Sequence, residues 1–65
     1  MIISPQDISD HSARTGTSVF TVVPGVDVRR DDLIHWEGRA YAVQRVQRTL
    51  ASGAKVVETT YRAKL

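Results

Sequence analysis

The stretch that decides the fold is DDLIHWEGRAYAV, residues 31–43. Its first half, from Asp32 to Trp36, has the apolar and aromatic composition that favours a strand. Glu37-Gly38 follows, and Gly38 can take the positive φ that a two-residue hairpin turn needs. The second half, Arg39–Val43, returns to strand composition. We therefore predict a β-hairpin centred on Glu37-Gly38.

The length of the turn also predicts which residues of the two strands lie opposite each other. Adjacent side chains of a strand point to opposite faces of its sheet, so the pairs divide between two sides. On one side we expect Trp36 opposite Arg39, Ile34 opposite Tyr41 and Asp32 opposite Val43; on the other, His35 opposite Ala40 and Leu33 opposite Ala42. The first side is bulkier, and we predict that it faces the core.

The segments on either side of this hairpin also indicate strands. Residues 18–23 are almost wholly β-branched or aromatic and run directly into Pro24-Gly25, which is typical of a type II turn. Downstream, Ala51–Ala54 has the composition of a hairpin loop, and Lys55–Leu65 that of a return strand. In this last strand we expect Val57, Tyr61 and Leu65 to face the core and to leave Glu58, Thr60 and Arg62 outside.

The apolar pattern changes phase within the strand that follows Gly38. Tyr41 and Val43 are odd-numbered, whereas Val46 and Leu50 are even-numbered, so a straight strand would place them on opposite faces. A β-bulge near Gln44 and Arg45 would return them all to one face and let a short sheet curl. The chain is thus predicted to be mainly β: a small antiparallel β-barrel or curled sheet.

The first seventeen residues differ from the rest in composition. Ser4 suits a helix N-cap, Pro5 the first helical position, and Gly16 a helix end, but few apolar residues lie between them. We therefore predict a short helix or an N-terminal arm over residues 1–17, and a β-barrel domain over residues 18–65.

Length and composition limit how such a fold is stabilised. A chain of 65 residues has one small core, and without cysteine it has neither a disulfide nor a thiolate metal site. His11 and His35 lack further ligands at metal-site spacing, so we predict no metal and no cofactor. Oligomerisation is the remaining source of stability, and we expect neighbouring subunits to complete the burial of a marginal monomer.

The sequence shows no convincing catalytic or membrane motif. Asp10-His11-Ser12 contains the residue types of a hydrolase triad, but three consecutive side chains cannot converge on one substrate. His35 with Glu37, and Asp31 with Asp32, lack a second convergent group. No apolar run reaches the length of a membrane span, and the first residues do not resemble a secretory signal. We predict a non-enzymatic protein made in the cytoplasm.

The arginines are the most suggestive surface feature, in a chain of net charge +2. Arg45 and Arg62 are predicted to be diagonal neighbours on the outward face. Three interpretations remain open: a solvated face, a salt-bridged subunit interface, or a phosphate contact. Trp36 is interpreted as a core residue or an interface anchor. The candidate residues for a subunit interface or a DNA-facing surface are Arg29, Arg30, Trp36, Arg39, Arg45, Arg48, Lys55 and Arg62.

Residues 31–43 resemble a segment of the phage head-tail joining (connector, or stopper) proteins. In that segment an acidic residue opens a strand, an aromatic residue precedes a tight glycine turn, and Arg, Tyr and Val follow. Phe20–Val26 resembles the preceding strand and turn of the family, and the similarity extends through the closing hairpin to Tyr61.

The resemblance implies a small β-barrel that forms a ring with its own copies in the virion. The implied partners are the portal and adaptor on one side and the tail on the other, with packaged DNA nearby. Two alternatives stay open. One is another small virion component, such as a capsid-decorating or tail protein, and the other is a small basic β-barrel that binds nucleic acid.

Overall fold

The computed structural model describes all of residues 1–65 and consists of one six-stranded sheet and a single short helical turn. In chain order the elements are β1 (Ile2–Ile3), the 3-10 turn η1 (Pro5–Asp7), β2 (Ile8–Arg14), β3 (Thr17–Val22), β4 (Leu33–Trp36), β5 (Arg39–Thr49) and β6 (Lys55–Lys64). The strand order across the sheet is β1-β4-β5-β6-β3-β2, and all neighbours are antiparallel except β1 and β4. The prediction of a mainly β, curled sheet is confirmed.

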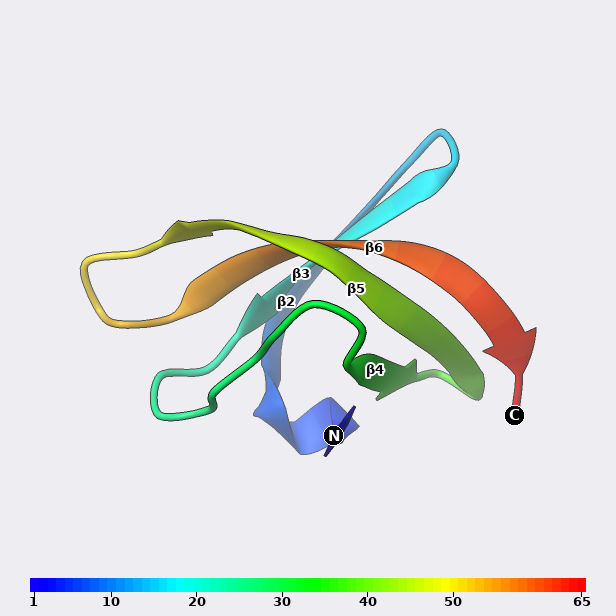
Figure 1. Cartoon of the computed structure of the whole chain (residues 1–65), viewed down its shortest axis with the longest axis horizontal. Helices are drawn as coiled ribbons and strands as arrows, with labels where there is room; N and C mark the ends of the chain where they lie inside the picture. The colour runs from blue at the N-terminus through cyan, green and yellow to red at the C-terminus, as the bar shows by residue number, and fades with distance from the viewer.

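The sheet bends into a half-barrel. Figure 1 shows the long strands β5 and β6 arching over β4 and the N-terminal segment, which lie beneath their concave side. Three register shifts interrupt the pairing of β5 with β6, and such bulges increase local twist and bend. One of them lies between Val43 and Arg45, where a bulge was predicted.

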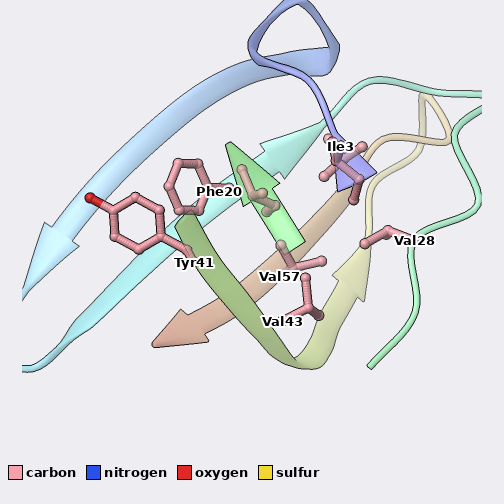
Figure 2. Close-up of a cluster of buried hydrophobic side chains, with 8 residues drawn as sticks. Ile3, Phe20, Val28, Tyr41, Val43 and Val57 are labelled. Carbon is pink, nitrogen blue, oxygen red and sulfur yellow. The ribbon is translucent and has the colours of Figure 1, made fainter. Parts of the chain in front are cut away.

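The core fills the concave side. Eight buried apolar side chains come together there from β1, β3, β4, β5, β6 and the loop before β4, and Figure 2 draws the cluster as sticks. They are Ile3, Phe20, Val22, Val28, Ile34, Tyr41, Val43 and Val57. Thr59 is also fully buried on this side, and its hydroxyl donates a hydrogen bond to the Ser18 carbonyl oxygen at 2.8 Å.

The hairpin over residues 33–42 has the predicted register. Ile34 lies opposite Tyr41, Leu33 opposite Ala42, His35 opposite Ala40 and Trp36 opposite Arg39. Glu37 and Gly38 both have positive φ, 48° and 74°, as a type I′ turn requires. Ile34, Tyr41 and Val43 are buried, so the face chosen for the core is the correct one.

The predicted helix over the first residues is wrong. Only Pro5–Asp7 form a helical turn, with Ser4 at its N-cap, and Ile8–Arg14 form a strand instead. This strand pairs with β3. A register shift between Ile8 and Asp10 interrupts the alternation of its side chains, so the sequence lacks the regular pattern by which a strand is recognised. Residues 1–17 therefore contribute two strands and the core residue Ile3 to the same sheet, and residue 17 begins β3.

Four predicted core positions are also corrected. Val46 lies opposite the buried Val57 but remains partly exposed, and a further register shift beyond Val46 leaves Leu50 off the core. Tyr61 lies opposite Tyr41, yet it is 55% exposed, because β3 pairs with β6 only as far as Thr59. Leu65, which follows the end of β6, is 61% exposed.

Candidate ligand-binding and interface surfaces

Three hollowed surfaces of the sheet contain four of the eight predicted site residues, Arg30, Arg39, Arg45 and Arg62. We call them the mouth, at the open end of the concave side; the outer groove, on the opposite face of β4, β5 and β6; and the arginine hollow, farther along that outer face. Each is built by strand pairing, because register decides which side chains share a face.

The mouth consists of two adjoining hollows of about 570 and 250 Å³. Arg39 and Tyr61 line both hollows. Lys64 lies opposite Arg39 in the β5–β6 ladder, so the two cations are neighbours. The buried ring of Tyr41 closes the inner side of the mouth, with its centroid 5.9 Å from that of Tyr61.

An aromatic cluster connects the mouth to the core. Phe20 contacts Tyr41 and Trp36, and the imidazole of His11 stacks on Phe20 with ring centroids 4.6 Å apart. His11 Nε2 and Trp36 Nε1 are buried and have no hydrogen-bond partner. Trp36 packs against the core from a half-buried position.

The outer groove has a volume of about 600 Å³ and is lined mainly by apolar side chains. Its floor consists of small residues, because Ala40 and Ala42 of β5 lie beside Ala63 of β6. Leu33 and Leu65 extend the apolar lining, while Asp31, His35 and Arg62 complete it.

The arginine hollow, of about 500 Å³, brings together Arg30, Arg45 and Arg62, so the two predicted neighbours do share a surface. Arg45 is not a free cation, however, because its Nε donates a hydrogen bond to Glu58 Oε2 across the two strands. This bond, together with the opposite charge of each partner, lowers the pKa of Glu58 and raises the pKa of Arg45. Asp31 also lines the hollow and offsets part of its positive charge.

The other predicted site residues lie apart. Arg29 pairs with Asp27 at 2.9 Å in the loop before β4, and Lys55 Nζ lies 3.5 Å from the Val26 carbonyl oxygen. Arg48 lines a separate hollow of about 320 Å³ with Arg14 on the outer face of β2, β3, β5 and β6. The eight candidate residues therefore do not form one site.

No family model matches the sequence, and comparisons with curated proteins and with solved structures find no match. These comparisons therefore assign no function to the surfaces. The structure brings together no group of three or more histidine, cysteine, aspartate or glutamate residues that could hold a metal ion. It also contains no helix with the length and apolar character needed to cross a membrane.

Sequence reasoning missed two functional candidates, Tyr61 and Lys64. The alternation of β6 predicts that Tyr61 lies on the core face. Alternation indicates the face of the sheet on which a side chain lies, but not whether another strand covers that face. Lys64 gave no local signal, since its importance depends on its register with Arg39.

Proposed function

We propose that the chain is a structural subunit of a tailed-phage virion, a head-tail connector that joins its own copies into a ring between the portal or adaptor and the tail. The resemblance of residues 31–43 supports this role, and these residues span β4, its turn and the start of β5. In this role the protein acts by fitting against neighbours in the virion and has no catalytic residues.

The outer groove is the observation that carries the proposal. A floor of alanine side chains on a solvent-facing sheet lets the surface of another protein approach the strands closely. Leu33 and Leu65 add apolar area whose burial contributes roughly 25 cal/mol per Å². An apolar surface with polar residues around it is the kind of feature that protein–protein contact sites have.

The occupant that we propose for the groove is the β5–β6 hairpin of the next copy. That hairpin has two partly exposed apolar side chains, Val46 and Leu50. Figure 1 shows the hairpin loop and the C-terminal end of β6 at opposite ends of the long axis of the molecule. Copies that join through surfaces at opposite ends associate head to tail, and such contacts close into a ring when the rotation between copies allows it.

Native mass spectrometry with two charge-introducing variants tests this contact. Ala63→Glu blocks the groove, and Leu50→Glu blocks the hairpin, so each variant alone is expected to be monomeric while the unchanged chain forms rings. An equimolar mixture is expected to form heterodimers, because each variant keeps the surface that the other lacks. Gln6→Glu, in the exposed turn η1 and outside both proposed contact surfaces, is the matched control and should still form rings.

Two results would contradict the proposed role. If the unchanged chain stays monomeric at all concentrations and with purified portal, adaptor or tail proteins, the subunit contact does not exist. Cryo-electron microscopy of phage particles supplies the second check, since absence of the chain from the head-tail junction rules out a connector. Its presence elsewhere in the particle would favour a capsid-decorating or tail protein.

A further inference from the structure

The mouth combines an exposed aromatic ring with unpaired positive charges, and the outer groove on the opposite face has no such combination. Tyr61 is held in place by the ladder with β5 and by the edge-to-face contact of its ring with Tyr41, at an angle of 72°. More than half of its surface is nevertheless open to solvent. A flat ring that is fixed in position and exposed can stack with another planar group at little cost in conformational entropy.

The cations around this ring are available for a ligand. Arg14, Arg39 and Lys64 are exposed and form none of the ion pairs of the structure, which join Met1 to Asp32, Arg29 to Asp27 and Arg45 to Glu58. Glu37 is the one acidic side chain that lines the mouth. Arg14 also lines the hollow on the outer face that contains Arg48, whereas Arg39 and Lys64 line no hollow other than the mouth.

We propose that the mouth binds single-stranded nucleic acid, with one base stacked on Tyr61 and the flanking phosphates paired with Arg39 and Lys64. Two adjoining hollows that meet at Arg39 and Tyr61 suit a base and the backbone beside it. Stacking requires a base that is free of its own duplex, which favours a single strand over a double helix. This site uses different residues from the arginine hollow, where Arg45 is engaged by Glu58.

Fluorescence anisotropy with labelled oligothymidylate and oligouridylate of equal length tests the site. The unchanged protein is expected to bind one or both, and its affinity should fall steeply as salt rises, because bound phosphates release counterions. Binding of either strand supports the proposal, since both supply an unstacked base and phosphates. A preference for one of them reports contact with the 2′-hydroxyl group of the RNA or with the C5-methyl group of thymine, the two groups by which the strands differ.

Four substitutions separate stacking from charge. Tyr61→Ala should weaken binding about tenfold without changing the salt dependence, and Tyr61→Phe, which keeps the ring, should retain the affinity. Arg39→Ala should weaken binding and reduce the slope of log affinity against log salt by about 1. Arg62→Ala, which removes the same charge from the outer face, should leave the affinity nearly unchanged. All three positions are exposed, so circular dichroism should show an intact sheet.

Several outcomes would overturn the site. If Arg62→Ala and Arg39→Ala lower the affinity for the oligonucleotide equally, the net charge of the protein attracts the strand without a specific site. If Tyr61→Ala leaves the affinity unchanged, no base stacks on Tyr61. Tighter binding to duplex than to single strands, or complete displacement by polyglutamate at equal charge concentration, identifies a different ligand. The Ala63→Glu variant should bind the oligonucleotide normally, because its substitution lies in the outer groove, so the test is independent of ring formation.

Discussion

At the scale of single residues, the turns determine most of the local geometry. Glu37 has a φ of 48°, in the left-handed region that side chains other than those of Asn, Asp and Gly rarely adopt. Gly38 follows at 74°, and together they give the hairpin the twist that its strands need. A suboptimal residue therefore occupies the first position of the most important turn.

This strain leads to a prediction at Glu37. Glu37→Asn is expected to raise the free energy of unfolding by about 0.5 to 1 kcal/mol, because Asn tolerates the left-handed conformation and Asn-Gly is the preferred type I′ pair. Urea denaturation at neutral pH measures the change. Glu37→Gln, which removes the charge without easing the backbone, is the control, and an equal gain in both variants would assign the effect to charge.

At the scale of elements, the β5–β6 hairpin depends on bulges and one ion pair. The bulge at Gln44 lets Val43 and Val46 share the concave face, and it places Arg45 outside, beside Glu58. The hydrogen bond from Arg45 is the largest cause of the lowered pKa of Glu58, and a weaker bond from Gln47, at 3.1 Å, adds to it.

The ion pair predicts a pH dependence that can be followed at one carboxyl group. In the folded protein the pKa of Glu58 should lie below 4.5, its ordinary value, and Arg45→Ala should raise it toward that value. Because the folded-state pKa is depressed, the pair stabilises the sheet above pH 4.5 and loses its effect as the pH falls through the folded-state pKa. The stability change is expected to be small, since the pair is exposed.

NMR titration of the Glu58 side-chain carbon measures both pKa values directly. Arg48→Ala is the matched control, because Arg48 lies on the same strand and forms no ion pair. If the two arginine variants have the same Glu58 pKa, the pairing across the strands does not exist in solution.

At the scale of the whole molecule, the core is small for its surface. Twelve of 65 residues are buried, and several large apolar side chains remain at the ends and edges of the sheet. A chain of this size without disulfides gains only a small net stability from its own core, so contacts with neighbouring subunits would add substantially to it. The proposed ring would cover part of the apolar surface that the half-barrel leaves open.

Thermal stability should consequently depend on protein concentration. Tm is expected to rise as the concentration of the unchanged chain increases through the range in which rings form, because association stabilises the folded state by mass action. Scanning calorimetry at several concentrations measures this, with the monomeric Ala63→Glu variant as the control. A Tm independent of concentration would show that the half-barrel is stable alone.

The sequence by itself determined the local features: the strand over residues 18–23, the turn at Glu37-Gly38 with its register, the bulge at Gln44 and Arg45, and the loop at 51–54. Turn chemistry and alternation act between near neighbours in the chain, so each is readable from a few residues. These features are sufficient to predict a curled sheet, but they do not predict the mouth or the outer groove.

Only the tertiary structure decided the rest. Strand Ile8–Arg14 exists because β3 offers it a partner, the parallel pairing of β1 with β4 buries Ile3, and β6 extends past β3 so that Tyr61 remains open. Each of these depends on contacts between segments distant in the chain. Alternation along a strand determines which face of the sheet a side chain lies on. The strands that assemble around it determine whether that face is covered.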